Sequence, residues 1–329
     1  MYSVIYVLRD DADQLVASYK SLLACTPSNL HFKVIVVDGG ANSPEDIQKV
    51  QHEVCTEVIR QPDGTPYYDL SSALNEGIYR SIGYTHENIK NLVIDGGAAL
   101  DHVVWCHSDM MFYQFDWITK LCQIYDHLWP LVGRLGPSTS NIDGGLQLLN
   151  EEQYLVHSNN CPWVMGSEYI KMMIQKRGFV YDPDFIRIGG VEDHCAWFDI
   201  LEMGMFVCVT PLVDVVHLGA GVRFLRDTNA DQMHNREVML KKYGRDIFPK
   251  IDFDLAQVQK DVGSTFGHLK TELLNLIPER NKTHNVLKEL FNIKRAKLGL
   301  ELYPISIETR KGREVYDIKD AAKVLPEDI

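Results

Sequence analysis

The chain has 329 residues, of which 45% are hydrophobic and 24% are charged. This composition is that of a globular protein with a buried core, and it excludes a disordered, collagen-like or coiled-coil chain. Seven cysteines are scattered without a Cys-x-x-Cys pair, a pattern that favours reduced thiols in a cytoplasmic protein over a disulfide framework or a zinc ribbon. No run approaches the roughly 18 apolar residues of a transmembrane segment, and the first residues lack the basic start of a signal peptide.

The net charge of −12 is unevenly distributed. Residues 1–224 carry 14 basic and 28 acidic residues, whereas residues 225–329 carry 19 and 17. An excess of carboxylates suits metal binding or acid–base chemistry, although a solvated acidic surface is the better explanation for most of them. The segment 268–313 holds ten basic and five acidic residues, and this milder basic tract suits an anionic acceptor or partner.

Short apolar runs alternate with amphipathic segments in the first hundred residues. The runs with strand composition are 4–8, 32–37, 54–59 and 103–106. The segments with helical character are 13–23, the stretch that begins at Ser43-Pro44-Glu45, and 70–82. Such alternation predicts a mostly parallel sheet with helices on both faces, whose ligands bind at the carboxyl ends of the strands.

The pattern changes in the second half of the chain. Residues 133–145 are rich in Gly, Pro, Ser and Asn, and a mixed segment follows to about residue 221. Helical spacing then returns in four segments: 233–243, 255–260, 268–277 and 285–297. The stretch 303–325 is strand-like and then charged, so a mainly helical C-terminal extension with a peripheral addition is expected.

The first candidate for chemistry is Asp38, which ends an apolar run and precedes Gly39-Gly40. A carboxylate in this position can bond a ribose or base while the glycine backbone approaches the ligand closely. The segment matches neither a Gly-x-Gly-x-x-Gly fingerprint nor a P-loop. A plain turn in which Asp38 caps the next helix is the structural alternative.

Two further segments carry candidate ligands and bases. Asp109 follows the strand at 103–106 and could hold a divalent cation through its oxygens, although lone strand-end aspartates are common. Glu192 and Asp193 follow a glycine pair at the start of an expected helix at 195–203, where helix capping is the structural alternative. His217 closes another apolar run, which is equally the setting of a core histidine.

The order and spacing of these motifs resemble the family 2 glycosyltransferases, nucleotide-sugar-dependent enzymes of the GT-A fold. The matching segments are Ile5–Asp10 for the first strand and its polar turn, Val36–Ser43 for the nucleotide loop, Ala73–Gly77 for the A-x-N-x-G helix, His107-Ser108-Asp109 for the metal motif, Arg177–Phe185 with Glu192–Trp197 for the acceptor block, His217–Gly219 for the closing H-x-G, and Asn235–Gly244 for the segment after the domain. The resemblance covers residues 3–245. This sequence departs from the family pattern at His107, Gly39 and Cys195, where Asp, Asn and an acidic residue are usual.

The resemblance implies an α/β fold of the GT-A type over residues 1–225, with a nucleotide-binding half at 1–112 and an acceptor half at 113–225. Residues 226–329 form the helical extension. The implied reaction is metal-dependent transfer of a sugar from a nucleotide-sugar, with a UDP-sugar favoured, to an acceptor hydroxyl with inversion.

The resemblance also implies roles for individual residues. Asp193, with Glu192 second, is the expected general base. Asp109 and His217 are the expected ligands of Mn²⁺ or Mg²⁺. His107 could be a further ligand, but a role in orienting the loop is preferred. The implied nucleotide-sugar site comprises Arg9, Asp38, Asn75, Ser108, Asp109, Trp163 and Arg223. For Trp163 core packing is an equal alternative, and for Arg223 a solvated surface position is the alternative.

Two other functions are compatible with this architecture. Sugar-1-phosphate nucleotidyltransferases begin with a Gly-rich loop after the first strand, which Arg9–Asp13 lacks. A non-catalytic GT-A binding module would not need the carboxylates at 38, 109, 192 and 193 or the imidazole of His217. The acceptor is left open by the sequence: a glycan, a lipid-linked sugar, a protein side chain, a small molecule or a modified nucleic acid.

Overall fold

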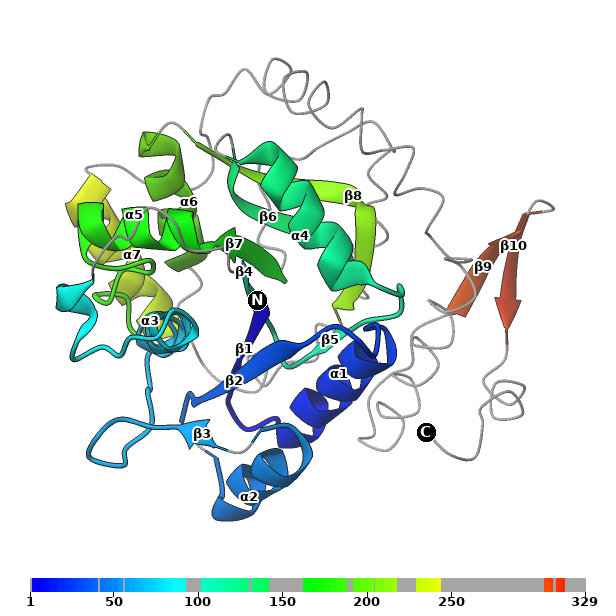
Figure 1. Cartoon of the computed structure of the whole chain (residues 1–329), viewed down its shortest axis with the longest axis horizontal. Coiled ribbons are helices and arrows are strands. Elements are labelled where there is room, and N and C mark those ends of the chain that lie inside the picture. Colours follow the sequence, from blue (N-terminus) through cyan, green and yellow to red (C-terminus); the bar gives the residue numbers. More distant parts are fainter. Residues whose placement is uncertain are drawn as a thin grey trace.

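The computed structural model describes residues 2–40, 42–55, 57–92, 102–129, 132–141, 162–187, 192–203, 205–217, 229–243, 305–309 and 312–316. In these residues an eight-stranded mixed sheet carries helices on both faces (Figure 1). The predicted α/β architecture is therefore confirmed. A two-stranded antiparallel hairpin near the C-terminus is the second sheet.

The first half alternates strands and helices as predicted. Its elements are β1 (Tyr2–Leu8), α1 (Ala12–Ala24), β2 (Phe32–Asp38), α2 (Pro44–Glu53), β3 (Val58–Ile59), α3 (Leu70–Ser81), the 3-10 helix η1 (Ile89–Asn91) and β4 (His102–Cys106). Ser43 caps α2 in a capping box with Asp46. The strand β3 is shorter than predicted because Val54 and Cys55 still bond the carbonyl of Val50 at the end of α2.

The second half is less regular. Its elements are β5 (Met110–Met111), α4 (Trp117–Leu128), β6 (Val132–Asn141), β7 (Trp163–Gly166), α5 (Ser167–Arg177), α6 (Glu192–Glu202), β8 (Phe206–His217), α7 (Asn229–Tyr243), β9 (Ile305–Thr309) and β10 (Gly312–Tyr316). The strand-like stretch predicted at 303–325 contains the β9–β10 hairpin. The helices predicted at 255–260, 268–277 and 285–297 lie outside the described residues.

The strand order is β3-β2-β1-β4-β7-β6-β8-β5. The first four strands are parallel, with Leu8 opposite Asp38 and Tyr6 opposite Cys106. The carboxyl ends of β1, β2 and β4 therefore lie at one edge of the sheet, as the predicted ligand edge requires. The strands β7 and β5 run antiparallel to their neighbours.

The short strand β5 determines where two distant motifs meet. The chain leaves β4, passes through His107-Ser108-Asp109 and pairs with the end of β8, so that Met110 lies opposite His217. This pairing brings together residues about 110 positions apart in the sequence.

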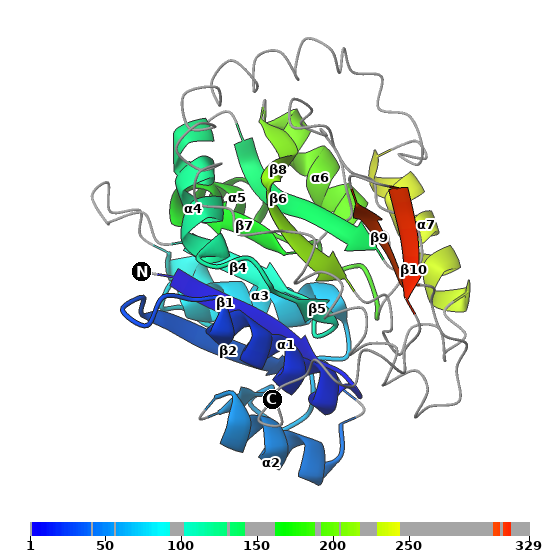
Figure 2. The same ribbon diagram turned by 90° about the vertical axis from the view of Figure 1, so that its right-hand side faces the viewer.

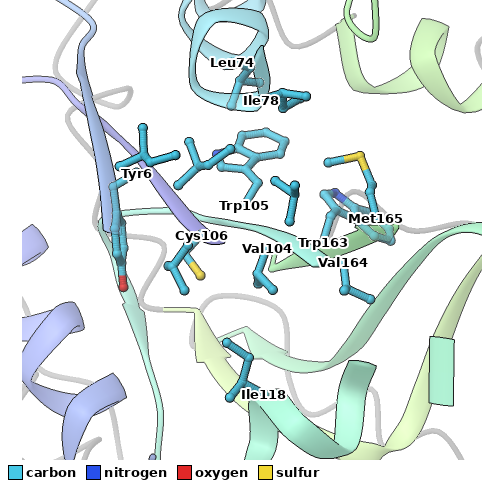
Figure 3. Packing of buried hydrophobic residues seen from close by; sticks show 14 of the residues in the cluster. Tyr6, Leu74, Ile78, Val104, Trp105, Cys106, Ile118, Trp163, Val164 and Met165 are labelled. Atoms are coloured by element: carbon cyan, nitrogen blue, oxygen red, sulfur yellow. The ribbon is translucent and has the colours of Figure 1, made fainter. Parts of the chain in front are cut away.

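The core fills both faces of the sheet. Side chains alternate along β4 and β7, so Trp105 and Trp163 point to the side of α3, whereas Val104 and Val164 point to the side of Ile118 in α4 (Figure 3). Figures 1 and 2 show α1 and α4 on one face of the sheet and α3 and α5 on the other. Among the helices that the structure describes, none has the length and apolar character needed to cross a membrane.

Candidate metal and nucleotide site

Three potential metal ligands converge at the end of β4. The Nε2 atom of His217 lies 3.2 Å from Oδ1 of Asp109 and 3.3 Å from Nδ1 of His107. The Nδ1 of His107 lies 4.0 Å from the same carboxylate oxygen. The β5–β8 pairing creates this cluster, because it places His217 directly beside the loop that follows β4.

The spacing of these atoms fits a single cation. Ligand atoms about 2.1 Å from a metal, at angles of about 90–109°, lie about 3.0–3.4 Å from one another. The two shorter separations fall in this range, and all the ligand atoms lie within 4.8 Å of one another. A set of two imidazoles and one carboxylate suits Mn²⁺ better than Mg²⁺, which prefers oxygen ligands.

The charge state of Asp109 also suits cation binding. Burial opposes ionisation of this carboxyl, but the charges of His217 and His107 and the hydrogen bond with His217 outweigh the burial, so the pKa of Asp109 is lowered. The two imidazoles remain partly exposed, at 31% for His107 and 26% for His217. The cluster therefore combines a buried anion with two nitrogen ligands that solvent can reach.

His107 belongs to this cluster, whereas the sequence favoured a role in orienting the loop. Its ring packs edge-on against Trp105, with centroids 5.0 Å apart. This contact comes from the last strand residues of β4 and directs the imidazole toward His217. The structure thus brings together Asp109 and His217, the two predicted ligands, and adds His107 as a third candidate.

The loop after β2 is organised around the buried carboxylate of Asp38. The backbone N–H of Gly40 and the amide of Asn42 donate to its Oδ1, and Nε of Arg60 donates to Oδ2 at 2.8 Å. Asp38 is fully buried, while the Arg60 side chain is 40% exposed. Arg60 is thus the part of this ion pair that a nucleotide base could reach. No local pattern indicates Arg60, because it lies 22 residues after Asp38 and the two meet only through the pairing of β2 with β3.

Arg9 extends the same edge beyond β1. Its guanidinium donates to the carbonyl of Tyr68 at 3.2 Å, and its backbone N–H donates to Asp11. Asp10 adopts a left-handed conformation with φ of 56° and donates its N–H to Asn42. A non-glycine residue in this conformation is held there by its surroundings, as is common in ligand-binding loops.

Ser108 joins the cluster of His107, Asp109 and His217 to the loop that follows β1. Its hydroxyl donates to the carboxylate of Asp11, which also receives the N–H of Arg9. The structure therefore places Arg9, Asp38, Ser108 and Asp109 at one edge of the sheet. Asp11 was not predicted, although its position three residues after the end of β1 was the available signal.

The side chain of Asn75 makes hydrogen bonds to the backbone of a neighbouring loop. Its Oδ1 accepts the N–H groups of Val180 and Tyr181, and its Nδ2 donates to the carbonyl of Tyr181 at 2.6 Å. The side chain is buried, and these hydrogen bonds fasten the 180–181 loop to α3.

Trp163 lies in the core, which was the alternative to presenting a face to the sugar. It is 1% exposed, pairs with Trp105 across β4 and β7, and stacks beneath the guanidinium of Arg134. Arg223 lies outside the described residues.

Glu192 and Asp193 occupy the first turn of α6, as the sequence predicted. Glu192 is buried, and the Asp193 side chain is 16% exposed. Arg134 of β6 lies 3.5 Å from Oδ1 of Asp193. This partner was missed, because nothing in the sequence of a Gly-rich strand indicates which side chain across the sheet it will meet.

Comparisons with known proteins give structural neighbours only. No protein-family model matches the chain. No curated protein sequence matches it. The mannosyltransferase PcManGT from Pyrobaculum calidifontis, solved with GDP-Man and Mn²⁺, is 14% identical over 91% of this chain and 76% of its own, with a TM-score of 0.47.

Two further solved structures are similar to the chain. Residues 1–349 of S. aureus TarS, solved with UDP-GlcNAc, are 11% identical over 96% of this chain and 99% of that chain, with a TM-score of 0.41. A mycobacterial protein is 15% identical over 76% of both chains, with a TM-score of 0.40. At these scores the likeness carries no conclusion about function, which depends on the geometry of the site.

Proposed function

We propose that the protein is a metal-dependent glycosyltransferase that moves a sugar from a nucleotide-sugar to an acceptor hydroxyl. The observation that carries the proposal is the cluster of His107, Asp109 and His217 at the strand edge that also holds the Asp38 loop. A cation site beside a loop suited to a ribose and base is what binding of a nucleoside diphosphate requires. The motif order that resembles family 2 glycosyltransferases supports the same reaction.

The three clustered residues would hold the cation through one carboxylate oxygen and two imidazole nitrogens. A divalent cation supplies Lewis-acid stabilisation of the negative charge on a departing diphosphate. Asp109 offers the cation a buried carboxylate directly beside the two imidazoles. The Trp105 ring restricts the orientation of His107.

The nucleoside part of the donor is assigned to the Arg9–Asp38 edge. Asp38 fixes the loop through Gly40 and Asn42, and the exposed Arg60 guanidinium offers hydrogen-bond donors to a base carbonyl. Uracil presents two such carbonyls, which supports a UDP-sugar as the donor.

Asp193 is proposed as the general base that takes the proton of the acceptor hydroxyl, with inversion at the anomeric carbon. Its carboxylate is mostly buried yet reaches solvent, and the start of α6 favours the ionised form. A correctly placed general base contributes about 10²- to 10⁴-fold to a rate.

The test is thermal unfolding with UDP, GDP, UDP-glucose or UDP-GlcNAc, each with Mn²⁺ or with EDTA. A ligand at about 100 times its dissociation constant adds about 2.7 kcal/mol to the free energy of unfolding. We expect UDP or a UDP-sugar to stabilise the wild-type protein only when Mn²⁺ is present. Asp109→Asn should abolish the Mn²⁺-dependent part, whereas Asp63→Asn, in an exposed loop, should retain it.

The outcomes separate the competing functions. Stabilisation by GDP instead of UDP would retain the reaction and change the donor. If Asp193→Asn is still stabilised by the UDP-sugar and still releases UDP from it, Asp193 is not the general base. Stabilisation without any turnover would support a binding module, and stabilisation by a nucleoside triphosphate with a sugar phosphate would support nucleotidyl transfer.

A further inference from the structure

Arg134 is a fully buried arginine in the middle of the mixed part of the sheet. It lies in β6 and is 1% exposed. A buried guanidinium stays charged, so it is stable only where anions and ring faces replace the water it has lost. The groups that surround the Arg134 guanidinium therefore indicate which role its positive charge has.

Two aromatic rings hold the guanidinium in place. Its Cζ lies 5.3 Å from the ring centroid of Trp163 and 5.0 Å from that of Tyr181. Cation–π contacts of this kind are strongest in desolvated surroundings, and a planar guanidinium matches a ring face. The rings fix the position of the charge, and Asn75 in turn fixes the backbone of Tyr181.

The carboxylate beside this charge is Asp193. The Nη1 atom of Arg134 lies 3.5 Å from Oδ1 of Asp193, at the first turn of α6. An adjacent arginine favours the ionised form of a carboxyl group and restricts where it can move. Asp193 thus has a fixed, buried cation on one side and access to solvent on the other.

Aromatic contacts also connect Tyr181 with the cluster of His107, Asp109 and His217. The ring of Tyr181 packs edge-on against Trp105 with centroids 5.6 Å apart, and Trp105 packs against His107 at 5.0 Å. A continuous row of contacts therefore runs from His107 through Trp105, Tyr181 and Arg134 to Asp193. The two parts of the candidate site share one rigid support.

We propose that Arg134 is a positioning residue, which keeps the carboxylate of Asp193 ionised and fixed relative to His107. The inference rests on the proposed function, because it gives Arg134 a task only if Asp193 is the base. Arg134 itself is too deeply buried to contact an acceptor.

Other charged and titratable groups surround the pair and must be accounted for. Glu192 and Asp199 lie on α6, Tyr169 and Arg177 lie on α5, and Tyr181 lies in the loop that follows α5. Burial raises the pKa of Tyr169 despite the nearby Arg134, so this hydroxyl stays neutral in the acid range. Arg177 of α5 is paired with Asp199 of α6 at 2.6 Å, so this ion pair joins the two helices.

The experiment titrates the Asp193 carboxyl by ¹³C NMR in protein labelled at the aspartate carboxyl carbons. The signal is assigned by its loss in Asp193→Asn. In the wild-type protein we expect the pKa of Asp193 to lie below the ordinary value of about 3.9. In Arg134→Gln we expect it to rise by about 1–3 units, and in the control Arg177→Gln we expect it to stay in place.

A pKa of Asp193 at or above the ordinary value in the wild-type protein overturns the inference, and this measurement needs no variant to fold. An equal change in the pKa of Asp193 in Arg134→Gln and in Arg177→Gln overturns the inference as well, since a general destabilisation of α6 would then explain both. Failure of the proposed function has a different signature, because turnover would persist in Asp193→Asn whatever the titration shows.

Discussion

Single polar side chains fasten the loops around the candidate site to one another and to α3. Asn75 bonds the backbone of the 180–181 loop, Asn42 links Asp38 to the loop that follows β1, and Asp11 joins Ser108 to Arg9. Each of these side chains satisfies backbone or hydroxyl groups that would otherwise need water. The positions of the ligand-facing groups thus depend on residues that need not touch a ligand.

We expect Asn75→Ala to lower the free energy of unfolding by at least about 2 kcal/mol. The substitution leaves two buried backbone N–H groups, those of Val180 and Tyr181, without their acceptor, at about 1–3 kcal/mol each. Urea unfolding measures the loss, and the exposed Asn91→Ala should change stability by less than about 0.5 kcal/mol. A variant of normal stability that binds UDP weakly would instead assign Asn75 to the nucleotide pocket.

In the first half of the chain, α3 packs on the sheet through a close backbone approach. Gly77 of α3 faces β1, and a Cβ at this position would lie 2.7 Å from Cγ2 of Ile5. Because Ile5 is fully buried, it has no room to move. The glycine therefore sets the distance between α3 and the sheet.

We expect Gly77→Ala to destabilise the protein by about 1–3 kcal/mol, because overpacking outweighs the gain of about 1 kcal/mol in helix propensity. Ser72→Ala on the same helix should be neutral or slightly stabilising. The cost of Gly77→Ala should shrink in an Ile5→Ala background, since that change removes the clashing methyl group. Additive effects in this double-mutant cycle would disprove the proposed contact.

The elements themselves were largely predictable from the sequence, whereas their side-chain partners were not. Apolar runs and caps predicted β1, β2, α2 and β4 closely, because these signals are local. The ion pairs of Arg60 with Asp38 and of Arg134 with Asp193 depend on strand order and on loop paths. His107 combines both situations. Its motif was recognisable in the sequence, but its proximity to His217 depends on the pairing of β5 with β8.

At the scale of the whole molecule, the helix α7 is joined to residues 186 and 187, which precede α6 in the chain. Asn235 is buried and exchanges two hydrogen bonds with the backbone of Ile186, and Arg187 lies 4.0 Å from Asp231. Arg187 itself has a left-handed φ of 50° and bonds Asp69 at the start of α3. The described start of the C-terminal region is thus fastened to the same segment as α3.

Lys242 completes this attachment and gives it a pH dependence. Its Nζ lies 2.6 Å and 2.7 Å from the two oxygens of the buried Asp182, and 2.7 Å from Asp184. Burial alone would lower the pKa of Lys242, but the hydrogen bonds and charges of the two carboxylates outweigh burial and raise it. The contribution of Lys242 to stability is therefore fully present below about pH 10.5, its unfolded pKa, and is lost as the pH rises through the higher folded pKa.

We expect Lys242→Met to lower the free energy of unfolding by about 1–2 kcal/mol at pH 7. The substitution leaves the buried Asp182 without its cation. The loss is limited because the pair is partly exposed and solvent screens its charges. The difference between variant and wild type should narrow as urea unfolding is repeated at increasing pH above 10.5. Lys241→Met, the neighbouring exposed lysine, controls for the loss of one positive charge and should show no such narrowing. A difference that stays constant through this range would mean that Lys242 stabilises α7 by packing of its aliphatic stem rather than by its charge.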